Sequence, residues 1–513
     1  MKRYLLIGLS AALLSATAVP AMADVTLSLV SRYETGVFEK GAAEISTFDK
    51  ASKRLFVVNG ATSSIDMFDM ADPKKLVPVG KIDVTAYGGG VNSVAVKNGV
   101  LAAAIEAKPK QQPGVIAFFK TDGSFITKVA AGALPDMIGF TPDGRYVLTA
   151  NEGEPNDAYE DPEGSVTIVD LKNGVEKLTD ADVKQVNFRS IDKAPEGARI
   201  GKPGQAFAQD AEPEYIAFSP DSRTAYVGLQ ENNALGFIDI ASGKLEKVVG
   251  LGFKDHMVHP LDASDKDGGI NIKNWPVKGV YMPDTLAAFA VDGKTYILSA
   301  NEGDGRDYKA WVDEERIAKL KLDPAKFPNA AELQDEKNLG RLKAIKTMGD
   351  ANGDGLYEEI YVYGARSFSI WDDQGKQVAD SGAEFEQTLA ERYPNYFNSS
   401  SDSAKLDDRS DDKGPEPEGI AVGQIDGKTY AFIGLERMGG VMVYDVSTPA
   451  KPRFVDYVTS RDFTGDHKGG KAGDLAPEGL LFVGAGDSPN GKPLLVVTSE
   501  VSGSTAIFEI VKK

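Results

Sequence analysis

An acidic turn directly after an apolar, alternating segment recurs along this chain. The clearest copies are the turn 151–157 (NEGEPND), which follows 146–150 (YVLTA), and the turn 301–308 (NEGDGRDY), which follows 296–300 (YILSA). A second alternating segment follows the turn, as 165–170 does in the first copy. Because a strand–turn–strand unit that recurs at intervals of tens of residues is typical of repeat folds, this feature constrains the architecture more strongly than local propensity does.

Weaker copies of the unit keep its acidic residue, and a second set of acids precedes the first strand of most units. The glutamates that follow an apolar segment are Glu106, Glu152, Glu231, Glu302, Glu436 and Glu500. The acids that lead into a unit, most of them beside a proline, are Glu44, Asp136, Glu212, Glu214, Asp284, Glu416, Glu418 and Glu478.

Short alternating strands, Pro-Asp-Gly turns and regular spacing indicate an all-β protein. A solenoid would leave strand edges exposed, whereas a closed ring of four-stranded blades protects them. We therefore predict a single β-propeller over 24–513, with long loop insertions and seven or eight blades. Eight is favoured because eight strand pairs can be counted, one of them a hairpin of 359–363 with 368–371. The strand near 25–30 is expected to complete the last blade, and helices are expected at 312–320, 330–336 and 385–392.

Residues 1–23 have the pattern of a secretory signal peptide. Lys2 and Arg3 precede a mostly apolar stretch, and Ala21 and Ala23 form a small-residue cleavage site. We therefore expect a periplasmic or secreted protein, without a membrane span because no later stretch reaches about 20 apolar residues. The formal net charge of −19 becomes −21 without Lys2 and Arg3, which disfavours nucleic acid and anionic lipid as partners. With no cysteine, an exported chain must be stabilised by its core, by metal or by both.

Several long motifs resemble those of the choice-of-anchor I family, over nearly the whole chain after residue 23. They are 58–61 (VNGA), 88–93 (GGGVNS), 150–155 (ANEGEP), 229–234 (LQENNA), 262–269 (DASDKDGG), 409–419 (RSDDKGPEPEG) and 434–437 (GLER). The family is similar to the mesenchyme-specific cell-surface glycoproteins of mineralising animals, and its bacterial members are often labelled alkaline phosphatase. The resemblance thus implies either surface binding or phosphoester hydrolysis. The C-terminal segment 506–513 resembles a closing strand and lacks the hydrophobic anchor that many relatives carry, so attachment through such an anchor is not expected.

In a propeller, the two sets of acids are expected on one rim, because the first strand of each blade starts at the face to which the second strand returns. Like charges at this density raise each other's pKa unless cations intervene. All-oxygen donors favour Ca²⁺, with Mg²⁺ or Mn²⁺ next. The alternative is that these carboxylates only accept backbone N–H bonds in turns. The rim residues predicted to bind metal are Glu152, Glu214, Glu302, Glu418, Glu436 and Glu478.

A separate calcium site is predicted at 350–359 (DANGDGLYEE). Side-chain oxygens at alternate positions followed by Gly355 match the first half of a calcium loop, although Tyr361 stands where an EF-hand has its bidentate glutamate. The alternative is a solvated acidic hairpin turn. The predicted ligands are Asp350, Asn352, Asp354 and either Glu358 or Glu359. A weaker version of the pattern is formed by Asp262, Asp265 and Asp267.

Arginines are expected beside the acids of the rim. Arg437 follows Glu436, and Arg306 lies in the second clear acidic turn. A guanidinium group beside bound cations is a pairing that holds phosphate or carboxylate. Alternatively, these arginines only neutralise neighbouring acids. The sequence has no Gly-rich phosphate loop before a helix, no nucleophile elbow and only three histidines, so covalent catalysis has no candidate nucleophile.

Two functions remain open from the sequence. The first is an acidic, calcium-loaded propeller that binds an anionic small molecule, a mineral surface or a protein through its metal-and-arginine rim. The second is a metal-dependent phosphoester hydrolase, in which the metals polarise the phosphoryl oxygen and supply hydroxide. Binding is favoured because nucleophile and base are lacking. If the protein is an enzyme, the catalytic candidates are Arg306, Arg437, Glu152 and Glu302.

Overall fold

Each strand–turn–strand unit forms the centre of a four-stranded antiparallel sheet. The computed structural model describes residues 24–513, and the signal peptide predicted for 1–23 lies outside them. The sheet with the first clear acidic turn has the order β10 (Pro135–Phe140), β11 (Tyr146–Asn151), β12 (Ser165–Asp170) and β13 (Val183–Asn187). β11 and β12 pair without a register shift up to Asn151↔Ser165, so the acidic turn is the connection at the end of this hairpin.

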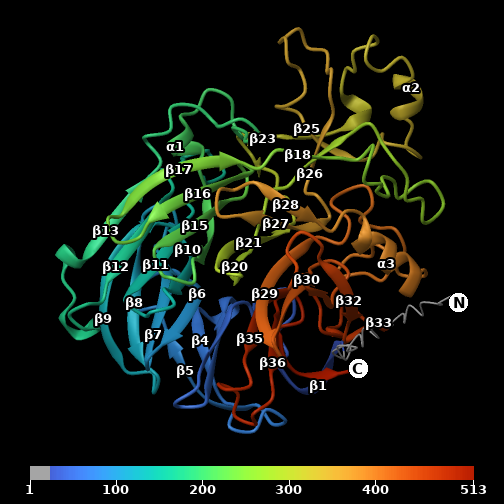
Figure 1. Cartoon of the computed structure of the whole chain (residues 1–513). Helices are drawn as coiled ribbons and strands as arrows, with labels where there is room; N and C mark the ends of the chain where they lie inside the picture. The colour runs from blue at the N-terminus through green and yellow to red at the C-terminus, as the bar shows by residue number, and fades with distance from the viewer. Residues whose placement is uncertain (1–23) are drawn as a thin grey trace, which may run out of the picture.

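Within residues 24–513, seven four-stranded antiparallel sheets stand around a common centre, which is the arrangement of a β-propeller (Figure 1). The prediction of an all-β propeller is therefore confirmed. The sheets before and after the one described above are β2 (Ser46–Asp49), β3 (Arg54–Asn59), β4 (Ser64–Asp69) and β5 (Val77–Asp83); β6 (Gly90–Lys97), β7 (Val100–Glu106), β8 (Pro113–Lys120) and β9 (Phe125–Ala133); and β14 (Pro213–Phe218), β15 (Thr224–Leu229), β16 (Ala234–Asp239) and β17 (Lys244–Gly250). The next two are β20 (Leu286–Val291), β21 (Lys294–Asn301), β27 (Ser367–Asp372) and β28 (Gln377–Asp380); and β29 (Pro417–Ile425), β30 (Lys428–Leu435), β31 (Val441–Asp445) and β32 (Arg453–Val458).

The last sheet joins both ends of the described chain. It contains β35 (Pro477–Val483), β36 (Leu494–Ser499), β37 (Ser504–Lys512) and β1 (Val25–Glu34). β1 pairs antiparallel with β37, from Val25↔Lys512 to Glu34↔Ser504. The N-terminal strand therefore completes the last sheet, as predicted, and closes the ring by main-chain hydrogen bonds.

The eighth strand pair counted in the sequence is not a separate four-stranded sheet. β21 pairs directly with β27, so the predicted hairpin of 359–363 with 368–371 does not form. Instead, β26 (Tyr361–Tyr363) belongs to a five-stranded sheet with β18 (Phe253–Asp255), β19 (Lys278–Val280), β25 (Lys343–Ile345) and β24 (Glu314–Arg316). The inserted segment 302–366 packs with residues 261–277 in a separate hydrophobic cluster, and the chain then returns to the same sheet.

Two short hairpins and three α-helices lie outside the sheets. The hairpins are β22 (Asp307–Tyr308) with β23 (Trp311–Val312), and β33 (Arg461–Asp466) with β34 (Lys471–Gly473). The helices among residues 24–513 are α1 (Phe207–Asp210), α2 (Ala330–Leu333) and α3 (Glu384–Arg392). The helix predicted at 385–392 is confirmed, and that at 330–336 is shorter than predicted. The helix predicted at 312–320 is wrong, because Glu314–Arg316 pair with β25 and only a 3₁₀ turn, Ile317–Lys319, follows.

The core lies between neighbouring sheets, since successive residues of a strand face opposite sides. Val147 packs toward the β6–β9 sheet with Phe118, whereas Leu148 packs toward the β14–β17 sheet with Val227. Both faces of such a strand are thus apolar, and polar residues are left at strand ends and in loops. Among residues 24–513, no helix has the length and apolar character needed to cross a membrane.

Candidate functional site

The proline-acid pairs of the sequence lie where the first strand of a sheet begins. β10, β14 and β29 start at Pro135, Pro213 and Pro417, and in each of them the pairing with the next strand shifts register just after the proline. A bulge of this kind leaves a residue unpaired and re-aims its side chain, and proline has no N–H to offer the ladder. The acid that follows the proline is thereby turned away from its own sheet and toward the centre of the ring.

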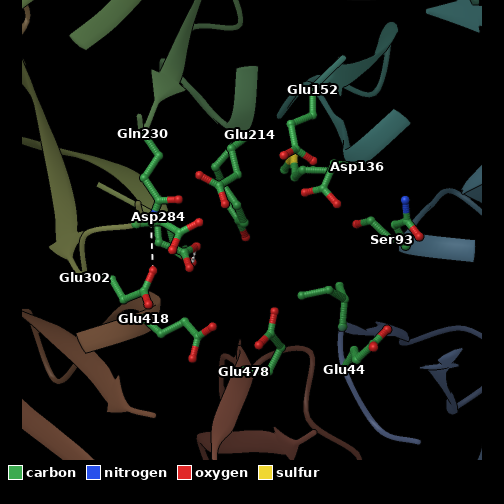
Figure 2. Close-up of a pocket in the computed structure, with 16 residues that line it drawn as sticks. Glu44, Ser93, Asp136, Glu152, Glu214, Gln230, Asp284, Glu302, Glu418 and Glu478 are labelled. Carbon is green, nitrogen blue, oxygen red and sulfur yellow. Dashed lines mark hydrogen bonds between the residues drawn. The ribbon is translucent and has the colours of Figure 1, made fainter. Parts of the chain in front are cut away.

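These acids meet in one cavity of about 320 Å³ at the mouth of the central channel. Figure 2 shows carboxylates from different sheets directed into the same space. Six of the seven sheets supply a lead-in acid, and the β6–β9 sheet supplies Asn92 and Ser93 instead. The lead-in acids that line the cavity, called the carboxylate ring below, are Glu44, Asp136, Glu214, Asp284, Glu418 and Glu478. The turn acids Glu152 and Glu302 line it as well, together with Asp304 and Gln230.

Few basic groups offset the charge of the carboxylate ring. Among residues 24–513, none of its six members forms an ion pair, although Lys413 Nζ lies 2.6 Å from Glu302 Oε1 at the edge of the cavity. Glu214 and Glu418 each keep a buried oxygen without a hydrogen-bond partner. A buried oxygen without a partner is costly unless water or a cation satisfies it.

Burial and mutual repulsion raise the pKa of the ring carboxyls. The pKa of Glu44 rises to about 8, because of burial and the charges of Glu500 and Asp136. Burial, together with Glu154 and Glu106, raises the pKa of Asp136 to about 7. The pKa of Asp284 rises to about 8 through burial and the charge of Glu302. Near neutral pH, the ring therefore holds protons that a bound cation would displace.

Two groups of three glutamates beside the ring repeat the same arrangement. In each group, one glutamate directly precedes a Pro-Glu pair. It lies near two turn acids, one from its own sheet and one from the preceding sheet. The carboxylate oxygens of each group lie within 4.8 Å of one another. The groups are the Glu212 trio, made of Glu152, Glu212 and Glu231, and the Glu416 trio, made of Glu302, Glu416 and Glu436.

The two trios differ in the cations they already contact. Lys413 Nζ lies 2.6 Å from Glu302 and 3.1 Å from Glu416, and Arg437 lies 3.1 Å from Glu416 and 2.7 Å from Glu436. Burial tends to raise the pKa of Glu416, but Lys413, Arg437 and Arg409 outweigh it and hold that pKa well below its usual range. The Glu416 trio is thus balanced by side chains of the protein itself.

In the described part of the chain, 24–513, the Glu212 trio contacts a single basic group, Arg306. Arg306 Nη2 lies 2.7 Å from Glu212 Oε1, but the same guanidinium group also pairs with Asp210, whose Oδ1 lies 2.6 Å from Nη1. Glu231 is 6 % exposed, and its Oε2 has no hydrogen-bond partner. Burial and the charge of Asp304 raise the pKa of Glu231 to about 8. This trio therefore lacks the compensating basic groups that the Glu416 trio has.

The structure brings most of the predicted rim residues together, and it separates the two predicted arginines. Glu152, Glu214, Glu302, Glu418 and Glu478 line one cavity, and Glu436 reaches it through Glu302. Arg437 keeps 27 % of its side chain exposed beside the Glu416 trio. Arg306, only 2 % exposed, donates to Asp210 and Tyr159 and is not free to meet an anion. Sequence reasoning missed Gln230 and Lys413, since neither belongs to the repeated acidic pattern.

The 350–359 loop gathers part of its predicted ligand set. Oxygens of Asp350, Asp354 and Glu358 lie within 4.8 Å of one another, and Asn352 donates to Glu358 at 2.6 Å. Backbone N–H groups already donate to these carboxylates, for example that of Gly355 to Asp350 at 2.9 Å. Glu359 points elsewhere and pairs with Lys278, so Glu358 is the acid that stands at the loop.

The pKa values of the ring predict how stability depends on pH in the metal-free protein. Glu44, Asp136 and Asp284 have folded-state pKa values of about 8, 7 and 8, above their ordinary values of 4.5, 3.8 and 3.8. At pH values between the ordinary and the folded-state pKa, the folded protein keeps protons that the unfolded chain has released. The free energy of unfolding therefore falls as pH rises from about 4 to about 8. Thermal melting of chelator-treated protein should show this fall, and Asp284→Asn should make it shallower. A melting temperature that stays level or rises over this range would contradict the assignment.

Two curated proteins are similar in sequence to part of this chain. Gigasin-3a of Magallana gigas is 31% identical over 190 residues, which is 35% of this chain and 66% of that protein. The mesenchyme-specific cell surface glycoprotein of Strongylocentrotus purpuratus is 24% identical over 380 residues, 63% of this chain and 48% of that protein. The chain thus spans less than two thirds of the length of either relative.

A solved structure and a family model extend the comparison to most of the chain. The WD40 domain of Toxoplasma gondii coronin aligns with a TM-score of 0.47 and 8% identity, over 96% of this chain and 89% of that one. The family model of the choice-of-anchor I domain matches residues 44–449, well over half of the sequence. The chain therefore belongs to the choice-of-anchor I family, as its motifs predicted.

Proposed function

We propose that this propeller is an exported protein that binds divalent cations at its channel mouth and, once loaded, holds an anionic ligand there. The observation that carries the proposal is the carboxylate ring: six buried or half-buried acids converge in one cavity without ion pairs among residues 24–513. Export is supported by the signal pattern at 1–23 and by the cell-surface description of the Strongylocentrotus purpuratus relative.

Calcium is the cation that this site suits best. The donors are oxygen atoms only, a set that hard cations prefer, and a flexible group of carboxylates suits the irregular, high coordination of Ca²⁺. Mg²⁺ or Mn²⁺ would fit fewer of the donors at once. A cavity of about 320 Å³ also leaves room for the waters that complete such a shell.

The Glu212 trio is the better of the two trios as a cation site. Lys413 lies within 3.1 Å of two members of the Glu416 trio, where its ammonium group takes the position that a metal would need. At the Glu212 trio, Arg306 contacts only Glu212, and Glu231 keeps an unpartnered oxygen. A divalent ion there would satisfy that oxygen and offset the remaining charge.

An anion can approach this mouth only after cations have bound. The ring alone would repel phosphate or carboxylate, whereas ring-bound cations beside Lys413 and Arg437 present positive charge on one side of the cavity. The proposed ligand is an anionic small molecule, a phosphoester, or the anions of a mineral or partner surface.

Metal-dependent phosphoester hydrolysis is the second candidate function. The observation that favours it is Asp136, whose pKa of about 7 suits proton transfer near neutral pH. The alkaline-phosphatase label of bacterial relatives agrees with it. Hydrolysis would require the cations to bind the phosphoryl oxygens and to supply hydroxide, with Glu152 and Glu302 nearby as ligands.

Removing ring charge should weaken cation binding. Glu214→Gln and Glu418→Gln are each expected to lower calcium affinity by between about tenfold and about a thousandfold, the upper limit being the attraction of about 4 kcal/mol between unit charges 4 Å apart at an effective dielectric constant of 20. Isothermal titration of metal-stripped protein measures this. Glu246→Gln, an equal change at an exposed position of strand β17, is the control. Equal affinities in all three variants and the wild type would rule out the ring as the site.

The 350–359 loop is proposed to bind calcium for stability only. Asp354→Ala should lower the calcium-induced rise in melting temperature, because it removes a carboxylate from the loop cluster. Ligand binding at saturating calcium should stay within about twofold, since none of the loop residues lines the channel cavity. A folded Asp354→Ala protein that has lost ligand binding would reverse this assignment.

Arg437 should contribute to anion binding at the loaded mouth. Arg437→Gln is expected to weaken inorganic phosphate binding at saturating Mg²⁺ roughly tenfold, the size of one charge-assisted hydrogen bond. Arg453→Gln is the control. Arg453 lies on β32, the outer strand of its sheet, where it pairs with Asp24 and Asp445. Phosphate binding that is independent of both metal and Arg437 would contradict the proposal. In the same preparations, metal-dependent release of phosphate from an aryl phosphate would favour hydrolysis over binding.

A further inference from the structure

A second acidic cluster lies outside the channel cavity, in loops that flank the five-stranded sheet. Oxygens of Asp262, Asp267 and Asp407 lie within 4.8 Å of one another, and none of the three lines the cavity of the mouth. Two of them belong to the weaker calcium-like motif of the sequence. The third comes from the segment 398–414, far along the chain.

The membership of this cluster differs from the sequence prediction in one residue. Asp265, the middle acid of the motif, pairs with Lys266 and with Arg341, so its charge is already offset. Asp407 occupies the place that Asp265 was expected to fill. The sequence motif could not identify Asp407, because its loop is far from loop 262–271 in the sequence and lies beside it only in the folded protein.

The contacts of the three acids leave coordinating positions free. The backbone N–H of Asn271 donates to Asp262 Oδ2, and the side-chain amide of Asn271 donates to Asp267 Oδ2 at 2.8 Å. Asp407 Oδ1 accepts a hydrogen bond from the Ser410 hydroxyl. Asp407 Oδ2, by contrast, has no partner although the residue is only 4 % exposed. A buried carboxylate oxygen left in this state needs a ligand.

No basic side chain compensates the cluster. Within 24–513, Asp262, Asp267 and Asp407 take part in no ion pair, and the neighbouring Glu386 carries a negative charge that is already paired with Arg366. The nearest guanidinium, that of Arg366, donates to the backbone oxygen of Asp262 and pairs with Glu386. Burial and these acids raise the pKa of Asp262 to about 7 and that of Asp407 to about 8.

We propose that Asp262, Asp267 and Asp407 hold one hard divalent cation, calcium by the character of the donors, which fastens segment 398–414 to loop 262–271. The ion would satisfy Asp407 Oδ2 and offset the three carboxylates together. It would also add a second link between two loops that Arg366 already joins through hydrogen bonds to the backbone oxygens of Asp262 and Ser410.

The position of Asp407 gives this site a consequence at the channel mouth. Arg409 follows two residues later and donates to Glu416 at 2.5 Å, and Lys413 in the same segment contacts Glu302 and Glu416. A cation at Asp407 therefore fixes the segment that delivers the basic groups of the Glu416 trio. The site is independent of cation binding in the ring.

The test compares Asp407→Asn with Asp265→Asn in the full protein, using calcium alone as the probe. Asp407→Asn should bind one calcium fewer per chain in equilibrium dialysis, whereas Asp265→Asn should keep the wild-type number. Calcium at 100 times its dissociation constant should slow amide exchange in 398–414 by about 100-fold in wild type and in Asp265→Asn, and not in Asp407→Asn.

Two outcomes would overturn the site. They are an unchanged number of bound calcium ions in Asp407→Asn, or exchange in 398–414 that calcium does not slow in wild type. If Asp407→Asn fails to fold, Asp267→Asn, at a half-buried position, provides the same comparison. Glu214→Gln separates this site from the ring: it should alter calcium affinity at the mouth and leave the calcium-dependent protection of 398–414 in place.

Discussion

Ring closure forces like charges together, and the rest of the channel mouth follows from that constraint. Each sheet is stable only because both of its faces are packed against neighbours, and that packing directs the start of every first strand toward one axis. An acid at this position in six sheets brings six carboxyl groups into one cavity of about 320 Å³. The fold therefore creates a requirement for cations that no single sheet has.

The two trios show how a repeated arrangement can meet this requirement in different ways. At the Glu416 trio, the insertion before β29 supplies Lys413 and Arg409. The negative charge of the trio is therefore balanced by basic side chains of the protein itself. At the Glu212 trio, Arg306 is the only basic group in contact within residues 24–513, and it pairs with both Glu212 and Asp210. The difference arises in the loops, not in the sheets, which is where function diverges on a constant scaffold.

The sequence predicted the sheets well, because the period-2 pattern marks the strands and an acidic turn follows the second strand in six of the seven sheets within 24–513. It failed where long insertions interrupt a sheet: β21 and β27 pair across 302–366, which a local count of strand pairs cannot detect. The carboxylate ring was predictable, since propeller symmetry alone brings equivalent positions together. Arg306 was misjudged because its partners Asp210 and Glu212 come from another loop. Asp407 was missed for the same reason.

These failures share a physical cause. Periodicity reports how a segment packs against its neighbours in the ring, but whether a charged side chain is free depends on which distant loop covers it. Arg366 illustrates the point: it sits in a turn that resembles a rim position, yet Glu386 and the backbone oxygens of Asp262 and Ser410 hold it. A basic residue in this family is therefore a candidate for anion binding only if its loop partners leave an N–H unengaged. By that criterion Arg437 qualifies, because its ion pairs with Glu416 and Glu436 use only Nε and Nη1 and part of its side chain stays exposed.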